Sequence, residues 1–467
     1  ASPYSTYSYA AYTFERASAE ARFKKRMYRR YASSEDSASI PVPDLTYLVE
    51  PVEGVWLLGI DANVFALSQR VDTKNPENPA NFVSSGNAGW NRMLVEKRHV
   101  MTWIKNVVDQ AATLNKQLIA FSHYPMLDTT RGAGSDIAAF FGTERRQPTA
   151  ETMREMAGTG LHLHLGGHLH KNNTAVLESE DSFLVDIQIP SIAAYMPAFK
   201  LLTLHSDDRI EIETVTLDNV PGFDDLFEHY RMEQACLTQN NSPTLWHAGI
   251  LESKSYREFT QWHLTELTRR RYLPRDWPKE MREYFERVTG TSLLTLLALN
   301  TGVRLSDVRA VACSEPDLLT KLSDHTLPDS ADDNLYLKKL IADWRAAEYV
   351  VMEELQKNGI SRESVDGIDG LMIASDFYRL SSAGGSLAAK DIEPRRRFYT
   401  IARTLMNASA IHSSPDTDAE SDEFAPVGMY YKRQSCLLLN ILHQLAKGLP
   451  NDHFMIDFKQ RHLRVIG

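Results

Sequence analysis

Short apolar runs separated by polar turns dominate the first half of the chain and predict β-strands. The run 55–60 (VWLLGI) is apolar throughout, which is typical of a strand buried on both faces. A helical period of apolar positions over 94–114 follows it and leads into another apolar run, so this segment predicts a βαβ-like unit. Further strands are predicted at 45–49, 118–121, 161–165, 174–178, 183–189, 201–205 and 210–217.

Polar and basic stretches fill the spaces between these strands. The composition of 70–90 and of 128–142 predicts loops, and 149–156 predicts a helix. The segment 17–31 carries six lysines and arginines and predicts a solvated surface helix.

Strand patterns nearly disappear after residue 220, and helical periodicity replaces them. In the clearest helix, 334–358, Leu340, Trp344 and Val351 share one face, and Gly359 stands at the C-cap position. The segment 381–386 (SSAGGS) predicts a flexible loop. The remaining helices are expected at 223–237, 256–271, 279–299, 394–408 and 430–447.

Together, these patterns predict an α/β (α+β) fold in two domains. The first domain spans 1–220 and contains all the strands that the pattern predicts. The second domain spans 221–467 and is mainly α-helical.

Composition and charge limit the classes of function. The 467 residues are 43% hydrophobic and 24% charged, as in ordinary globular proteins. The net charge of −10 argues against nucleic-acid binding, and no apolar stretch approaches the ~18 residues of a membrane span. The three widely spaced cysteines, Cys236, Cys313 and Cys436, exclude a disulfide scaffold and favour a reducing, cytoplasmic compartment.

Three of the predicted strands end in polar signatures: Asp61-Ala62-Asn63, Ser122-His123-Tyr124-Pro125 and Gly167-His168-Leu169-His170. Ligand sites in α/β sheets lie outside the carboxyl ends of the strands, so these side chains can converge in space. Histidine is the commonest metal-ligating side chain. The pattern is consistent with a metal site and also with a buried, hydrogen-bonded histidine pair in a turn.

The order and strand context of these motifs resemble the second half of the calcineurin-like metallophosphoesterase family. The resemblance covers roughly 45–217 and rests on the strand ending in Ser-His-Tyr-Pro, the strand ending in Gly-Gly-His-Leu-His, and the upstream strand ending at Asp61. It implies a sandwich of sheets flanked by helices.

The resemblance also implies a chemistry and a substrate class. Two divalent cations (Mn, Fe or Zn) would lie ~3.5 Å apart, and a bridging hydroxide would attack the phosphorus of a phosphate mono- or diester. His123 and His168 would bind one cation and His170 the other. Other residues expected to line the site are Asp61, Asn63, Asn172 and Asn173, and His164 is expected to hydrogen-bond a ligand histidine.

The ligands that the family draws from its first half have no counterpart in the printed sequence. It contains no Asp-x-His, no Gly-Asp and no Gly-Asn-His segment, so the bridging carboxylate and the catalytic acid histidine are missing. Three explanations are open: a separate or proteolysed N-terminal fragment, a truncated chain, or an inactive relative. Because all three expected histidines are retained, we favour a missing fragment or truncation.

Two other functions compete with the metallophosphoesterase. One is a catalytically inactive scaffold or binding protein that acts through its helical domain. The other is a mononuclear zinc hydrolase, in which His123, His168 and His170 surround one ion. The stoichiometry of bound metal separates the three hypotheses.

Overall fold

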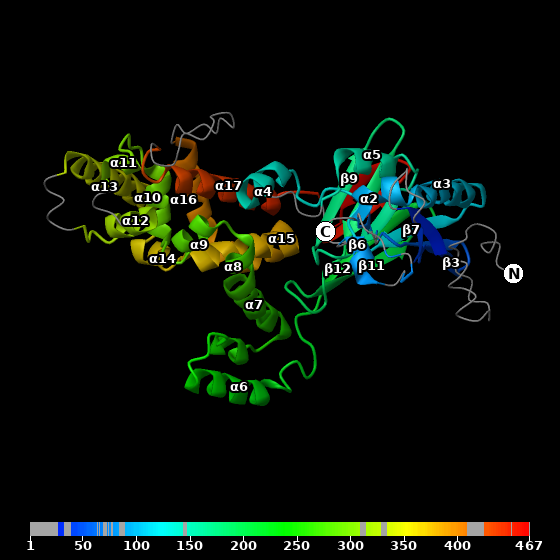
Figure 1. Ribbon diagram of the computed structural model, residues 1–467, viewed down its shortest axis with the longest axis horizontal. Helices are drawn as coiled ribbons and strands as arrows, with labels where there is room; N and C mark the ends of the chain where they lie inside the picture. Colours follow the sequence, from blue (N-terminus) through cyan, green and yellow to red (C-terminus); the bar gives the residue numbers. More distant parts are fainter. Residues whose placement is uncertain are drawn as a thin grey trace.

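The computed structural model describes residues 27–31, 39–62, 64, 66–68, 72, 74–75, 78–83, 89–142, 147–308, 314–327, 334–408, 425–449 and 451–466. The described residues form two lobes, one built on β-sheets and one helical, with a helical arm below them (Figure 1).

The sheet lobe is built on two main sheets. The larger has six strands in the order β3 (Tyr47–Val52), β4 (Val55–Ile60), β7 (Gln117–Ser122), β8 (Leu163–Gly166), β10 (Phe183–Gln188) and β9 (Asn173–Glu178). Its four central strands are parallel, and the two edge strands, β3 and β9, run antiparallel to their neighbours. The second sheet is antiparallel and contains β11 (Ala198–Leu204), β12 (Arg209–Thr216), β13 (His453–Asp457) and β14 (His462–Val465). Two short pairs are β1 (Met27–Tyr31) with β2 (Ser39–Pro43), and β5 (Ala66–Leu67) with β6 (Phe82–Val83).

Each face of the six-stranded sheet is covered. Leu58 and Trp56 pack in one core with Trp90 and other residues of the helices α2 (Gly89–Glu96), α3 (Arg98–Thr113) and α5 (Ala150–Ala157). Val185 on the opposite face packs against Ile212 of the second sheet. The lobe therefore has three layers, helix, sheet and sheet, which confirms the mixed α/β class.

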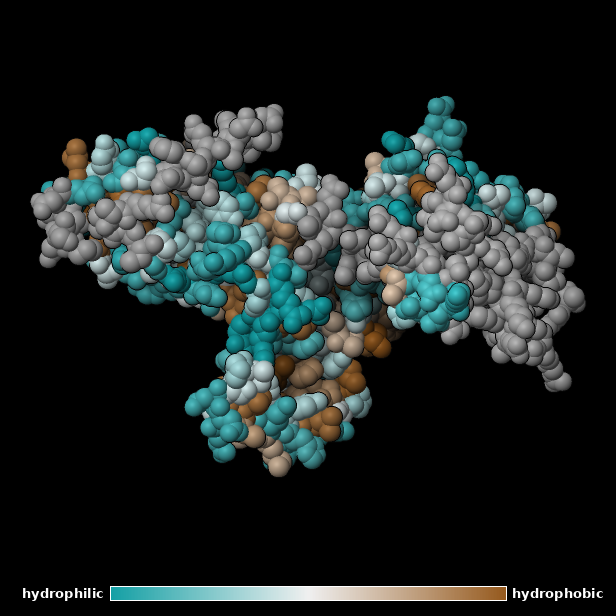
Figure 2. Space-filling view, viewed as in Figure 1, coloured by the Kyte–Doolittle hydropathy of each residue, from teal (hydrophilic) through white to brown (hydrophobic). Residues whose placement is uncertain are grey.

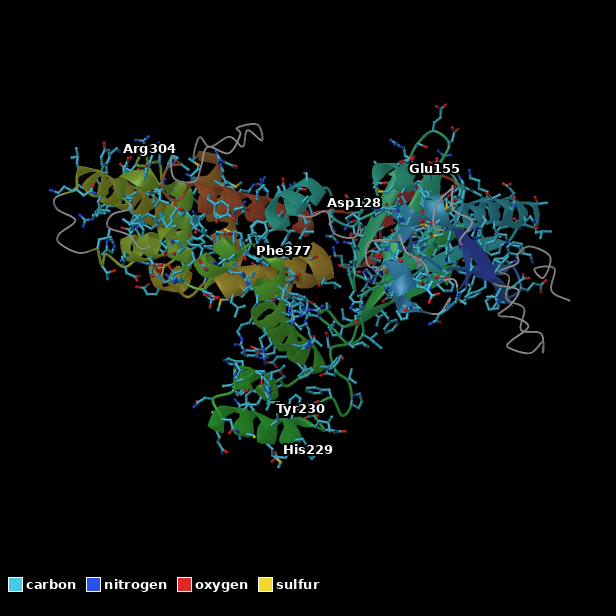
Figure 3. The ribbon with its side chains drawn as sticks, viewed as in Figure 1. Asp128, Glu155, His229, Tyr230, Arg304 and Phe377 are labelled. Atoms are coloured by element: carbon cyan, nitrogen blue, oxygen red, sulfur yellow. The ribbon has the colours of Figure 1, made fainter. Side chains whose placement is uncertain are left out.

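The helical lobe has a core of its own, in which Leu294, Leu340 and Phe377 are buried. Phe377 lies well inside this lobe in Figure 3. Its helices are η5 (Thr268–Tyr272), α8 (Leu273–Asp276), α9 (Lys279–Phe285), α10 (Gly290–Ala298), α11 (Leu305–Val308), α12 (Glu315–Ser323), α13 (Leu335–Lys357), α14 (Arg362–Asp366), α15 (Gly370–Ile392), η7 (Glu393–Arg395), α16 (Arg396–Ala408) and α17 (Met429–Ala446).

The prediction of a loop over 128–142 is wrong for more than half of these residues. Residues Gly134–Phe141 form helix α4, which lies beside α17 in the helical lobe (Figure 1). Phe140 is buried there, with its ring 5.0 Å from that of Trp277. The polar residues around α4 gave this segment the composition of a loop, but its apolar face is covered by residues distant in sequence.

The prediction that the helical domain extends to residue 467 is also wrong. Strands β13 and β14 return to the sheet lobe, and β13 pairs with β12 in antiparallel register. Phe454 and Ile456 are buried between the sheets, which is the physical reason for the pairing. The helical lobe is thus an insertion between β12 and β13.

The segment SSAGGS is part of a helix, contrary to the predicted flexible loop. It lies within α15, which is kinked at Gly384 (φ 74°). A Cβ on Gly385 would lie 2.0 Å from the carbonyl oxygen of Ala446, so the glycine allows α15 to approach the end of α17 closely.

Other elements also differ from prediction in type or in extent. Met27–Tyr31, placed in a surface helix by its charge, is strand β1, and the rest of that predicted helix lies outside the described residues. The predicted helix 94–114 divides into α2 and α3 at Lys97. The predicted helix 279–299 divides into α9 and α10, because a capping box at Thr289 starts the second helix.

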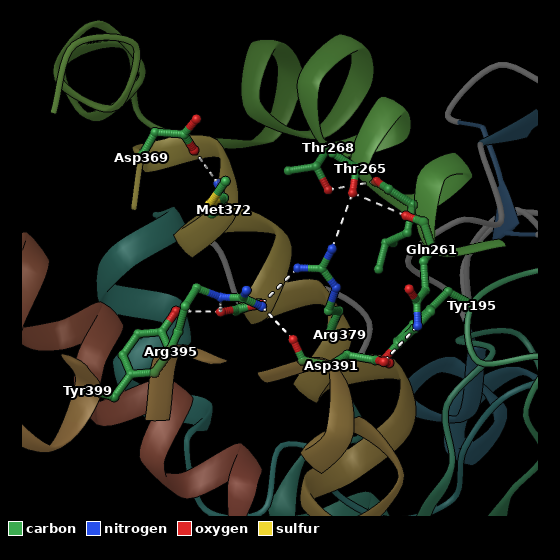
Figure 4. A network of polar contacts seen from close by, with 12 residues as sticks. Tyr195, Gln261, Thr265, Thr268, Asp369, Met372, Arg379, Asp391, Arg395 and Tyr399 are labelled. Atoms are coloured by element: carbon green, nitrogen blue, oxygen red, sulfur yellow. Dashed lines mark hydrogen bonds and ion pairs between the residues drawn. The ribbon is translucent and has the colours of Figure 1, made fainter. Parts of the chain in front are cut away.

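Buried polar contacts hold the helical lobe together and join it to the sheets (Figure 4). Asp376 is fully buried and accepts hydrogen bonds from Arg379, Arg395 and Tyr399. Tyr195, from the connection after β10, donates to Asp391 on α15 at 2.5 Å. Asp128 lies where the two lobes meet (Figure 3).

The arm consists of α6 (Phe227–Gln239), η4 (Ala248–Glu252) and α7 (Tyr256–Leu267). Apolar side chains are visible on it in Figure 2, and Leu226, Tyr230 and Met232 are exposed there. Among the helices that the structure describes, none combines the length and apolar character needed to cross a bilayer.

Candidate metal centre

The predicted histidines lie at the carboxyl edge of the six-stranded sheet. Strand β7 ends at Ser122 and its parallel neighbour β8 ends at Gly166, so His123 and His168 emerge from adjacent strand ends. The backbone amide of Gly167 donates to the carbonyl of His123 at 3.1 Å and joins the two loops. His168 and His170 adopt positive φ angles of 63° and 51°, so the second loop turns sharply at both residues.

The rings of His123 and His168 meet edge-on, with an angle of 66° between their planes. Nδ1 of His168 lies 2.8 Å from Nε2 of His123, and their ring centroids are 4.7 Å apart. The ring of Tyr124 packs 4.6 Å from that of His168 and 4.9 Å from that of His123. His123 is exposed and His168 half-buried, so the pair is open to solvent.

The local electrostatics favour a neutral His123. Partial burial, and next the nearby His170, lower the pKa of His123 below its usual value. A neutral imidazole has a lone pair available for a cation, whereas an imidazolium has none. His170 is thus close enough to His123 to affect its charge.

The His123–His168 pair meets part of the requirement for a cation site. Ligands that bind one cation at ~2.1 Å have their nitrogens about 3.0–3.4 Å apart, so a small ring movement would turn the observed contact into shared ligation. Within the described residues, however, no group of three or more His, Cys, Asp or Glu side chains could hold a metal ion. The structure therefore brings together two of the three expected ligands.

Asp61 reaches the same edge of the sheet, at the end of β4, but its carboxylate has other partners. Oδ2 accepts the amide of Leu45 at 3.1 Å and lies 3.2 Å from Nζ of Lys97. Lys97 is buried and also donates to the carbonyl of Asp61. Asn63, expected beside it, lies outside the described residues.

Asn172 and Asn173 are buried at the junction of the two lobes. The Nδ2 of Asn172 donates to Asp452 and to the carbonyl of Ala383 in α15. The Oδ1 of Asn173 accepts from Arg131 at 3.0 Å. Asn172 thus joins the loop after His170 to the helical lobe directly, and Asn173 does so through Arg131, which also donates to Leu445 of α17.

His164 is fully buried beneath the pair. Its two ring nitrogens lie 2.8 Å from Asp186 and 2.9 Å from Ser122, so both have partners other than the predicted ligands. The expectation that it hydrogen-bonds a ligand histidine stays a prediction.

Sequence reasoning did not single out Asp186 or Arg131. Asp186 is the one charged residue in the apolar strand FLVDIQ, and a lone carboxylate in such a strand indicates a buried polar partner. The sequence contained no such indication for Arg131, because its partners lie far away in α17 and at the start of β9.

With this geometry established, the chain was compared with known proteins, and neither a family model nor a curated protein matches it.

Proposed function

We propose that this chain contributes the histidine ligands of a metal-dependent phosphoesterase that hydrolyses phosphate mono- or diesters. The observation that carries the proposal is the contact between His123 and His168 at the ends of two adjacent parallel strands. The packing of two sheets with a layer of helices on one side agrees with part of the arrangement that the resemblance to calcineurin-like metallophosphoesterases implies.

The proposed cofactors are two divalent cations, Mn, Fe or Zn, with His123 and His168 holding one and His170 the other. When bound, they supply Lewis-acid stabilisation of the phosphoryl oxygens and a water molecule of lowered pKa. Imidazoles carry no negative charge, so a pair of cations also needs carboxylates. We propose that these come from a separate N-terminal polypeptide fragment.

The residues of this chain have defined tasks in the proposal. His123 and His168 bind through ring nitrogens that already face each other, and the lowered pKa of His123 favours the neutral form that a cation needs. The ring of Tyr124 packs against both and restricts their rotation.

A catalytically inactive scaffold is the second candidate, and a specific observation favours it. Of the nearby carboxylates, Asp61 is paired with Lys97, and Asp186 is buried among hydrogen-bond donors. Neither is available to a cation without breaking these contacts. In this candidate the helical lobe performs the binding function.

Metal content and phosphate release test the proposal. The full chain is dialysed against Zn²⁺ or Mn²⁺, its bound metal is counted, and hydrolysis of p-nitrophenyl phosphate and bis-p-nitrophenyl phosphate is followed. His168→Ala should lose metal and hydrolysis while keeping its melting temperature, because the ring is half-buried and outside the core. The matched control is His229→Ala, an exposed histidine on the arm (Figure 3).

Each outcome distinguishes among the candidates. About two bound ions with hydrolysis supports the binuclear site, and one ion supports the mononuclear zinc site. No bound ion and no hydrolysis supports the scaffold over a metal site that this chain completes by itself. Unchanged turnover in His168→Ala would reject the proposed site.

A further inference from the structure

A chain of buried hydrogen bonds lies directly beneath the histidine pair. It crosses three neighbouring parallel strands, β7, β8 and β10, on which His164 is in register with Ala120 and with Asp186. Asp186 Oδ1 lies 2.8 Å from His164 Nδ1, and His164 Nε2 lies 2.9 Å from Ser122 Oγ. His164 and Asp186 are both fully buried.

Asp186 organises the backbone that follows His123. Its Oδ2 accepts the amides of Met126 and Leu127, each at 2.8 Å. Its Oδ1 accepts from Gln188 at 3.1 Å in addition to His164. A buried carboxylate with four such donors has little freedom to move.

Ser122, which directly precedes His123, binds the backbone of the residue that directly follows His123. Its hydroxyl donates to the carbonyl of Tyr124 at 2.9 Å, and the same carbonyl accepts from Trp90 of α2 at 3.1 Å. The carbonyl of His123 itself accepts from Gly167. The backbone of the whole turn is thus held by the buried network while the imidazole of His123 projects outward.

Gly166 is needed for this arrangement. A Cβ at that position would lie 2.4 Å from Nε2 of Gln188, the side chain that donates to Asp186. The first glycine of the Gly-Gly-His-Leu-His motif therefore makes room for the network.

We propose that Asp186, His164 and Ser122 are positioning residues that hold the His123 turn so that its ring meets His168. The inference rests on the proposed function for its consequence, which is metal affinity, but the positioning can be observed without metal. Ser122 is not a nucleophile in this arrangement, because its hydroxyl is directed inward to His164 and the carbonyl of Tyr124.

The test uses the full chain with histidine labelled by ¹⁵N in the imidazole ring. In the metal-free wild type, NMR should show the coupled, hydrogen-bonded nitrogens of His123 and His168. Ser122→Ala should abolish that signature and lower Zn²⁺ affinity by ~10–100-fold, the usual effect of losing a residue that orients a ligand. Ser122→Thr, which retains the hydroxyl, should restore both.

The matched control is Ser182→Ala. It removes a hydroxyl with one 2.7 Å hydrogen bond from a nearly buried serine just before β10, at the end of that strand away from Asp186. It should leave both the NMR signature and Zn²⁺ affinity unchanged. If Ser122 had a purely structural role, Ser122→Ala and Ser182→Ala would lower the melting temperature equally. Neither variant would then change the NMR signature of the histidine nitrogens.

The outcomes separate this inference from the proposed function. Loss of the signature in Ser122→Ala supports the positioning role even if wild type binds no Zn²⁺, a result that would reject only the metal site. If wild type binds Zn²⁺ but Ser122→Ala retains the affinity and the signature, the positioning role is rejected and the metal site stands. Asp186→Asn provides a second variant, because it keeps the shape of the side chain and removes its charge.

Discussion

Nδ1 of His168 lies 2.8 Å from Nε2 of His123, although the two residues are 45 positions apart in the chain. The contact arises because β7 and β8 are parallel neighbours that end at the same edge of the sheet. If both rings bind one cation, their contributions to its affinity must be coupled.

A double-mutant cycle on Zn²⁺ affinity measures this coupling. His123→Ala and His168→Ala should each weaken binding by more than the ~10–100-fold typical of losing a residue that only orients a ligand. The double variant should lose much less than the product, because one missing ligand already disables the site. Independent, multiplicative effects would show that the two rings do not share an ion. His170→Ala should combine multiplicatively with either in the binuclear arrangement.

Replacing Gly384 should separate a steric effect from a backbone effect. A Cβ there would lie 2.7 Å from Nη2 of Arg131, whose guanidinium also donates to the carbonyl of Leu445 in α17. Gly384→Ala should lower the free energy of unfolding by ~2–4 kcal/mol, since strain at positive φ adds to the clash. Urea titration measures the loss.

Gly359→Ala is the matched control for Gly384. Gly359 also has a positive φ, 62°, but a Cβ there would meet no atom within 4 Å. Only the backbone strain applies, so the expected loss is ~1 kcal/mol. Equal losses in the two variants would show that Arg131 is not confined by α15.

Stability should rise with pH because of Lys200. Its amine is buried at the junction of the lobes, and burial lowers its pKa from 10.5 to about 7. Between these values the unfolded chain binds a proton at Lys200 that the folded chain does not, so raising the pH favours folding. Between the two pKa values, Lys200 raises the free energy of unfolding by at most ~1.4 kcal/mol per pH unit. This slope falls to zero below the pKa of the folded state and above the pKa of the unfolded state.

Urea titrations from pH 6 to 10 check the Lys200 effect. Lys200→Met should reduce the slope of unfolding free energy against pH, even though it also loses the hydrogen bonds to Asn172 and Thr214. Lys254→Met, which removes an exposed lysine, should keep the wild-type slope. A wild-type slope in Lys200→Met would show that the ammonium stays charged in the folded state.

Phe140→Ala should destabilise the helical lobe, although Phe140 lies in the part of the chain that forms the sheets. The ring is 1% exposed and packs against Trp277, so its removal leaves a cavity and should cost ~3–5 kcal/mol. Calorimetry should show the transition of the helical lobe moving to lower temperature. Ile192→Ala, at a 60% exposed position, should move no transition. A shift confined to the sheet lobe would contradict the docking of α4.

The sequence alone was sufficient for the strands of the six-stranded sheet, for the hairpin of β11 and β12, and for the polar ends of β4, β7 and β8. Strand β4 coincides with the apolar run 55–60, and the hairpin of β11 and β12 follows alternating residues around a polar turn. These features depend on local periodicity and turn chemistry, which are present in any short window of sequence. The α13 helix is a similar case, with Asn334 as its N-cap and Gly359 after its end.

Only the tertiary structure decided how these elements meet. Helix α4 and strand β13 have weak local patterns, and each is stabilised by apolar partners more than a hundred residues away: Trp277 packs against Phe140, and Ile212 pairs with Phe454. The same holds for the candidate site. The sequence pattern indicated that His123 and His168 follow strands. The parallel pairing of β7 with β8 then brings their ring nitrogens into contact. Asp186, on the neighbouring strand β10, holds the turn that carries His123. Local sequence determines where a strand ends, whereas the burial of apolar surface between distant segments determines which strand ends become neighbours.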